Sequence, residues 1–410
     1  MDLADAYRDV RAATEALCAP LSPEDCCVQS MQDASPAKWH LAHTSWFFET
    51  LVLEGVPGYA AFDPAFRVLF NSYYQSVGEQ HPRPERGVLS RPSLDRVLAY
   101  RHHVDGCVLR LLDAGAPATA LDVVELGLHH EQQHQELVLT DLKHAFSRNP
   151  LRPAYRERPP EPAGRTQPLR WIGFEAALRE IGHSGPGFAF DNERPRHRVF
   201  VEDFELASRP VTNAEYLGFV RDGGYARPEL WLSDGFAALA SRGWRAPLYW
   251  EERDGACFTF TLGGMARLCP DEPVCHVNHY EADAFARWAG ARLPTEAEWE
   301  CAAEAAPLEG GFVESGRLQP APSPAGVLHP AALFGDVWEW TASAYAPYPG
   351  FRPLAGSLGE YNGKFMSGQL VLRGGSCATP RSHIRRSYRN FFPPDARWQF
   401  SGIRLARDSR

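Results

Sequence analysis

Hydrophobic residues in the first 150 positions recur every three to four residues, which is the spacing of amphipathic helices. The spacing predicts four helices, over residues 5–17, 36–53, 90–112 and 117–146. Ser35 is expected to cap the second helix, with Pro36 at its first helical position, and Ser93 is expected to cap the third. Four helices in this order predict a four-helix bundle, an architecture whose interior often holds metal ions.

The second part of the chain loses this long helical period and shows short apolar runs between glycine- and proline-rich turns. The run at residues 198–204 predicts a strand. Helices are predicted over residues 213–221 and 280–289, and a third from Pro294 onward. Strands and short helices mixed in this way are typical of an α+β domain.

Composition agrees with two domains. The chain has 410 residues, of which 44% are hydrophobic and 23% charged, as in ordinary globular proteins. Residues 151–168 are rich in proline, arginine and glutamate, which is typical of an interdomain linker. We therefore expect a bundle over residues 1–150 and an α+β domain over residues 169–410.

Charge and cysteine content exclude several classes of function. The formal net charge is −9 and no basic stripe is present, so a nucleic-acid partner is not expected. No apolar run is long enough to cross a membrane, and the first residues lack the pattern of a secretory signal. The nine cysteines include no CxxC pair, which favours reduced thiols and a cytoplasmic protein. No pattern indicates an oligomeric state.

Three histidines on two of the predicted helices form a candidate metal site. His130 and His134 lie four residues apart, so both imidazoles leave the same helix face. His43 aligns with the apolar positions of its helix and is expected to face inward in preference to His40. Glu136 lies on another face and is expected outside the first ring of ligands. Three imidazoles suit zinc hydrolysis or iron(II) with O2, and the spacing does not choose between them.

The long segment at residues 55–87 joins the second and third predicted helices. A connection of this length in a compact domain is usually functional or disordered, and its aromatic run at residues 70–74 argues against disorder. It contains Tyr73 and Tyr74, whose hydroxyl groups could donate a proton near a metal site. The run HPRPER at residues 81–86 could bring a guanidinium group to a substrate carboxylate, which arginine binds through two hydrogen bonds.

Six motifs resemble those of one known family. They are SPAKWHLAH at residues 35–43, FNSYYQSVG at 70–78, HEQQHQE at 130–136, LPTEAEWE at 293–300, GDVWEW at 335–340 and LRGGS at 372–376. Together they resemble the sulfoxide synthases (hercynine oxygenases) of ergothioneine biosynthesis, over nearly the whole chain. The resemblance implies an N-terminal DinB-like four-helix bundle. It also implies a C-terminal domain of the formylglycine-generating-enzyme (sulfatase-modifying-factor, C-type-lectin-like) fold.

The resemblance also implies a reaction. Iron(II), held by His43, His130 and His134, would be the cofactor. With O2, the enzyme would join the sulfur of cysteine or γ-glutamylcysteine to C2 of the hercynine imidazole and release a sulfoxide. The adjacent Tyr73 and Tyr74 are similar to the branch of the family with active-site tyrosines in this loop, where a tyrosine supplies the proton that favours sulfoxide over simple thiol oxidation.

Further substrate contacts follow from the resemblance alone. Gln133 is similar to a family residue near the trimethylammonium group of hercynine. Arg83 is similar to a residue that binds the cysteine carboxylate, with Asp33 as its helper. Asn390 and Phe391 occupy positions that meet hercynine in relatives, and an aromatic face can hold a quaternary ammonium.

The chain departs from formylglycine-generating enzymes in one respect that concerns their chemistry. Those enzymes carry a cysteine pair where this chain has Thr379 and Ile384, so their copper–thiolate chemistry is not expected.

Three other functions stay open. A related carbon–chalcogen enzyme would take another thiol or a selenium sugar as second substrate. A non-catalytic metal-binding module and a zinc-dependent thiol transferase are also compatible with three histidines in a bundle.

Overall fold

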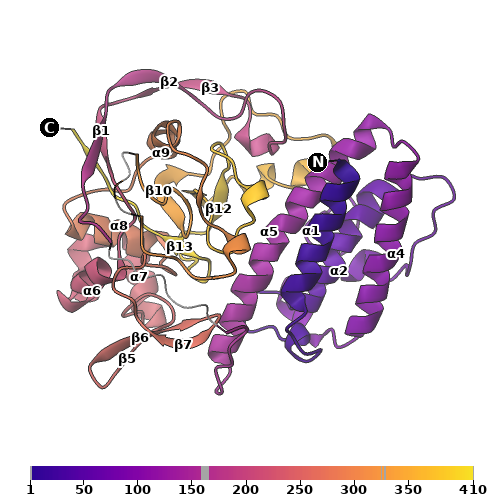
Figure 1. Ribbon diagram of the computed structural model, residues 1–410, viewed down its shortest axis with the longest axis horizontal. Coiled ribbons are helices and arrows are strands. Elements are labelled where there is room, and N and C mark those ends of the chain that lie inside the picture. Colours follow the sequence, from indigo (N-terminus) through magenta and orange to yellow (C-terminus); the bar gives the residue numbers. More distant parts are fainter. Residues whose placement is uncertain (1, 158–165, 325, 327–328, 410) are drawn as a thin grey trace. The chain divides into compact units, whose positions relative to one another are not determined.

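The computed structural model describes residues 2–157, 166–324, 326 and 329–409 (Figure 1). The chain divides into two compact units. One comprises Met1–Arg156 together with Leu354–Tyr361, and the other comprises Glu157–Pro353 and Asn362–Arg410. Residues 354–361, which were expected in the second domain, therefore pack with the first unit. Much of the predicted linker at residues 151–168 lies outside the described residues.

The first unit is built on the helices that the hydrophobic spacing predicts (Figure 1). They are α1 (Leu3–Cys18), α2 (Ala37–Phe48), α4 (Leu94–Asp113) and α5 (Ala118–Arg148), with the short α3 (Phe66–Leu69) between α2 and α4. α2 continues as a π-helical turn over Glu49–Leu53. The α5 helix packs against α1 and α2, and α2 also packs against α4. Every side chain of α2 is buried, so this helix forms the centre of the bundle.

The helix starts agree with the sequence only in part. Ser93 caps α4, and its side chain accepts a hydrogen bond from the backbone N–H of Arg96. The expectation that Ser35 caps α2 is wrong, because Pro36 occupies the N-cap position with extended backbone angles. The Ser35 hydroxyl instead accepts a hydrogen bond from Arg86, and its backbone N–H donates to Asp141. Long-range polar partners thus replace the local cap.

The second unit is an α+β domain with several small sheets (Figure 1). Its helices are α6 (Asn213–Arg221), α7 (Ser233–Arg242), α8 (His279–Trp288) and α9 (Glu296–Ala303). A three-stranded sheet has the order β1 (Trp171–Phe174), β4 (Phe204–Ala207), β14 (Ala406–Asp408). A four-stranded sheet has the order β12 (Asn390–Phe392), β11 (Leu370–Arg373), β10 (Trp338–Ala344), β13 (Ser401–Gly402). The smaller sheets are β2 (Ala177–Ile181) with β3 (His197–Val201), β5 (Trp250–Arg253) with β6 (Ala256–Thr261) and β7 (Gly264–Arg267), and β8 (Gly310–Gly311) with β9 (Phe334–Gly335).

The predicted elements of this unit are present with small shifts. The α6 helix spans the predicted residues, α8 begins one residue early, and α9 begins after Thr295, whose side chain caps it. The run at 198–204 belongs to two strands, β3 and β4. The α7 helix was not predicted; it is short and contains Gly235, a residue type that disfavours helices.

The tryptophan-rich motifs of the second unit form its core. Glu339 is fully buried on β10, and its carboxylate accepts hydrogen bonds from Trp299 Nε1 at 2.7 Å and Arg404 Nε at 2.9 Å. These contacts join α9, β10 and the C-terminal segment. The motifs at residues 293–300 and 335–340 are therefore explained by packing. The nine cysteines are free thiols, and no helix in the described ranges is long and apolar enough to span a membrane.

Candidate metal centre

Three buried histidines meet between α2 and α5. His43 comes from α2, and His130 and His134 come from successive turns of α5. Each offers one nitrogen to a group whose members all lie within 4.8 Å of one another. The Nε2 atoms of His43 and His130 are 3.2 Å apart. Such convergence of nitrogen atoms is the arrangement that a bound transition metal requires.

Outer hydrogen bonds fix which nitrogen of two of these rings is free. The Nδ1 of His43 lies 2.6 Å from the carbonyl oxygen of Phe70, which can only accept, so Nδ1 carries the proton. The carboxylate of Asp141 accepts from His40 Nε2 at 3.1 Å, which leaves His40 Nδ1 as an acceptor. That atom lies 2.8 Å from Nδ1 of His134, which therefore donates. Both His43 and His134 are left with an Nε2 lone pair for a metal.

Burial keeps the three imidazoles neutral. It lowers the pKa of His43 and His134 well below the ordinary value of 6.5, and lowers the pKa of His130 to about 3. The same cause lowers the pKa of His40. Because only the neutral imidazole has a lone pair to give, the site is poised to bind a cation at neutral pH.

This burial predicts a steep acid sensitivity of the metal-free protein. Below the ordinary pKa of 6.5 the unfolded chain takes up protons at these histidines, while the folded chain does not. Stability is therefore present above pH 6.5 and is lost as the pH falls toward the folded pKa, by up to about 1.4 kcal/mol per pH unit for each histidine. Urea unfolding of the metal-free protein between about pH 7 and pH 5 measures this slope. In a His130→Gln variant, the free energy of unfolding should depend less steeply on pH, because one buried histidine is gone. Equal slopes in the variant and the wild type would contradict the conclusion that buried His130 causes part of the acid sensitivity.

The tyrosine pair lies in the same unit, next to aromatic residues of α2. The rings of Tyr73 and Tyr74 stack with centroids 4.8 Å apart. Tyr74 is fully buried and packs against Trp46, with ring centroids 5.4 Å apart. Burial raises the pKa of both tyrosines, so both are protonated and able to donate at neutral pH.

A third tyrosine, Tyr361, was not predicted from the sequence. Its ring lies 5.6 Å from that of His130 and 6.3 Å from that of Tyr73. Its hydroxyl donates a hydrogen bond to Oε1 of Gln133, the residue between the two α5 histidines that the resemblance assigns to hercynine. Tyr361 thus lies beside both the histidine group and the tyrosine pair. No local sequence pattern predicts this position of Tyr361, because all of the residues that it contacts here are far from it in sequence.

Glu360 fastens the segment at residues 354–361 to the tyrosine loop. One carboxylate oxygen accepts from the backbone N–H of Ser76 at 2.9 Å and from its hydroxyl at 2.6 Å. The other accepts from the N–H of Gln75 at 3.0 Å. These bonds hold Tyr361 and the Tyr73–Tyr74 pair in one arrangement.

The structure places the predicted carboxylate-binding residues at the surface of the first unit. Arg83 and Asp33 are exposed, and the Arg83 guanidinium donates to the backbone oxygen of Asp33. Arg86, three residues later, is buried instead and lies 3.4 Å above the ring of Trp39, which stacks on His43. Burial and the charge of Arg83 lower the pKa of Arg86 to about 9.

Arg86 has spare hydrogen-bonding capacity. It donates to the hydroxyl groups of Ser35 at 2.9 Å and Ser72 at 3.3 Å, while its Nε has no partner among the described residues. A buried cation that donates hydrogen bonds to neutral hydroxyl groups favours an incoming anion. Arg86 lies in the segment predicted to supply a guanidinium group, residues 81–86, but the resemblance selected Arg83 in its place.

Asn390 and Phe391 lie on β12 in the second unit. Phe391 stacks on Tyr345, with ring centroids 4.0 Å apart and an angle of 10° between the planes. The side-chain oxygen of Asn390 accepts from the backbone N–H of Phe391 at 2.9 Å. Both residues are partly exposed and therefore accessible to a ligand.

Two protein families match the two units. The DinB superfamily matches residues 6–138, and the sulfatase-modifying factor enzyme 1-like domain matches residues 173–329 and 319–409. The expected fold class, a DinB-like bundle followed by a domain of the formylglycine-generating-enzyme type, is thereby confirmed.

Three similar proteins cover the chain to different extents. The hercynine oxygenase of Mycolicibacterium thermoresistibile is 36% identical over 91% of this chain and 87% of its own length. The hercynine oxygenase of Mycobacterium tuberculosis is 36% identical over 93% of both chains. The formylglycine-generating enzyme of Streptomyces coelicolor is 30% identical but covers only 55% of this chain. Of these three relatives, the two hercynine oxygenases are the ones that share both units.

Proposed function

The chain belongs to the hercynine oxygenase family, and from this premise we propose that it is an iron(II)-dependent sulfoxide synthase of ergothioneine biosynthesis. Its substrates would be hercynine, O2 and a thiol, either cysteine or γ-glutamylcysteine. The product would carry a new bond between the thiol sulfur and C2 of the hercynine imidazole. The observation that supports this most is the buried group of His43, His130 and His134 in a chain that shares both units with hercynine oxygenases.

The residues present fit iron(II). His43, His130 and His134 would hold it through nitrogen atoms, and the group contains no carboxylate, so substrates could occupy other positions. Bound iron(II) supplies the redox chemistry that O2 needs in order to react with a thiol, whereas zinc has no redox chemistry. Phe70 keeps His43 in the required tautomer, and His40, oriented by Asp141, does the same for His134.

The surrounding side chains have separate tasks in this proposal. Tyr73 or Tyr74 holds the proton that favours sulfoxide formation, since the raised pKa of each keeps its hydroxyl protonated at neutral pH. The buried guanidinium of Arg86 binds the carboxylate of one substrate, a role for which it is better placed than the exposed Arg83 and its neighbour Asp33.

Hercynine would be held by polar and aromatic groups. Gln133, fixed by Tyr361, faces the substrate's trimethylammonium end. The prediction that Asn390 and Phe391 also contact hercynine is retained, with the aromatic face of Phe391 attracting the quaternary ammonium by about 0.5–2 kcal/mol.

Product analysis tests this proposal and identifies the thiol. The purified protein, loaded with iron(II), is incubated in air with hercynine and an equimolar mixture of cysteine and γ-glutamylcysteine. We expect mass spectrometry to show a hercynine sulfoxide conjugate formed mainly with one of the two thiols. The absence of any conjugate with either thiol would contradict the proposed function and favour another sulfur or selenium donor.

A further inference from the structure

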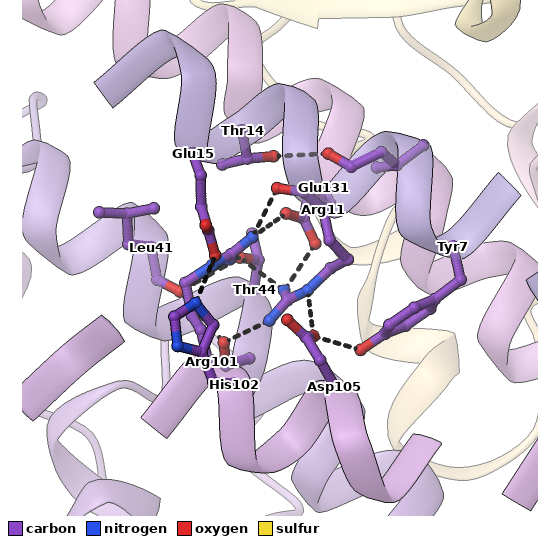
Figure 2. A network of polar contacts seen from close by, with 12 residues as sticks. Tyr7, Arg11, Thr14, Glu15, Leu41, Thr44, Arg101, His102, Asp105 and Glu131 are labelled. Carbon is purple, nitrogen blue, oxygen red and sulfur yellow. Dashed lines mark hydrogen bonds and ion pairs between the residues drawn. The ribbon is translucent and has the colours of Figure 1, made fainter. Parts of the chain in front are cut away.

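A network of buried charges joins several helices of the bundle (Figure 2). The carboxylate of Glu131 on α5 is held between two guanidinium groups. Arg11 of α1 donates to one oxygen at 2.8 Å, and Arg101 of α4 donates to the other at 2.9 Å. Glu131 and Arg101 are fully buried, and Arg11 is almost so. Three helices are therefore joined at this single carboxylate.

The same two arginines also donate hydrogen bonds to α2. Arg101 Nη1 donates to the hydroxyl of Thr44 at 2.8 Å and to the carbonyl oxygen of Leu41 at 3.1 Å. Arg11 Nη2 donates to the hydroxyl of Ser45 at 2.8 Å. Figure 2 shows Thr44 and Glu131 close together around the two guanidinium groups.

The positions of these contacts in the sequence are informative. Thr44 directly follows His43, and Glu131 directly follows His130. Consecutive residues of a helix point about 100° apart. The network therefore contacts α2 and α5 on helix faces next to those that carry His43 and His130. It thereby joins the residue after one candidate ligand to the residue after another, across the interface between α2 and α5.

Stability alone does not account for such a network. Removing charges from water is costly, and apolar residues of similar size often replace a buried ion pair without loss of stability. Here a second acid balances the charge, because Asp105 accepts from Arg11 Nε at 2.6 Å and from the Tyr7 hydroxyl at 2.8 Å. Each guanidinium group of the network thus meets a carboxylate through directional hydrogen bonds, a specific geometry that suits residues that set the positions of helices.

We propose that Arg11, Arg101 and Glu131 are positioning residues that fix the register of α2 against α5, and with it the separation of His43 from His130. This inference rests on the proposed function, because it concerns the site for its metal. Outer groups that orient metal ligands typically affect metal affinity by about 10–100-fold. We expect a loss of affinity of that size when the network is broken, even where the fold is kept.

Metal titration of three variants tests the inference without using activity. Cobalt(II) is added to the metal-free protein and its binding is followed by absorbance, with thermal unfolding measured in parallel. Glu131→Gln removes the central charge. The double variant Arg101→Leu/Glu131→Leu removes one positive and one negative charge. It leaves Arg11 paired with Asp105, and the Glu15 carboxylate, which loses its contact with Arg101, is partly exposed to solvent. As a control, Tyr100→Phe removes a buried hydrogen bond to Glu49 in the same bundle that touches neither Thr44 nor Glu131.

The expected pattern separates position from stability. Glu131→Gln and the double variant should both bind cobalt(II) about 10–100-fold more weakly than the wild type, and Tyr100→Phe should bind it normally. The double variant should unfold at a temperature close to that of the wild type. Its cobalt(II) affinity therefore tests the inference even if Glu131→Gln does not fold. Wild-type affinity in the double variant, or an equal loss in Tyr100→Phe, would overturn the inference while leaving the proposed function intact. A wild-type protein that binds no cobalt(II) would instead contradict the metal site itself.

Discussion

Replacing His130 with alanine is expected to abolish sulfoxide formation, with a fall in rate of more than about 100-fold, since the loss of outer partners alone costs about 10–100-fold. His130 contacts both other histidines of the group, with its Nε2 at 3.2 Å from that of His43 and its ring 4.6 Å from that of His134. Its removal leaves two imidazoles, too few to hold a metal firmly while substrates bind. Product formation by mass spectrometry and metal content of the purified variant are the two measurements.

A second histidine of the same helix provides the control. His144 also lies on α5, but its Nδ1 is 2.7 Å from the hydroxyl of Ser30 and it is not part of the metal-binding group. His144→Ala should keep both metal and activity. A wild-type rate in His130→Ala would contradict the assignment of the site, and an equal loss in both variants would point to a general defect of the helix.

Replacing Tyr73 or Tyr74 with phenylalanine is expected to change the product more than the rate of thiol oxidation. Each substitution keeps the ring and its stacking but removes a hydroxyl whose proton is retained at neutral pH because burial raises its pKa. Without the proton donor, oxidation of the thiol to its sulfinic acid should compete with formation of the carbon–sulfur bond. The ratio of sulfoxide to sulfinic acid is measured for both single variants, which also shows which tyrosine is the donor.

A buried tyrosine elsewhere in the first unit serves as the matched control. The Tyr155 hydroxyl donates to the backbone oxygen of Leu17 at 2.5 Å, so Tyr155→Phe loses a hydrogen bond without touching the candidate site. Its product ratio should equal that of the wild type. If neither Tyr73→Phe nor Tyr74→Phe changes the ratio, the proposed role of the pair is wrong, and Tyr361 beside His130 becomes the next candidate.

The parts of this structure that could be predicted from sequence depend on local spacing. The four long helices of the bundle follow from a period of about 3.6 residues, and His130 with His134 follows from the same period. Two motifs thus supplied the histidines that the structure brings together. The cap at Ser35 failed because a local preference of about 1 kcal/mol was outweighed by partners distant in sequence, Arg86 and Asp141.

The parts that could not be predicted depend on contacts between distant segments. Tyr361 reaches Gln133 from 228 positions away, and Glu360 reaches Ser76 from 284 positions away. His40 was set aside in favour of His43, yet it forms the link between Asp141 and His134. Helical spacing shows which face a side chain occupies, but it does not show which distant group will meet it there.

Oxygen uptake is the measurement that tests the central claim most directly. The iron(II)-loaded protein is followed with an oxygen electrode in the presence of hercynine alone, the preferred thiol alone, and both together. An iron-dependent sulfoxide synthase should consume O2 rapidly only when both substrates are present, in proportion to the conjugate formed, and should lose this uptake after chelation of the metal. Uptake that does not require hercynine, or that persists without the metal, would contradict the proposed function.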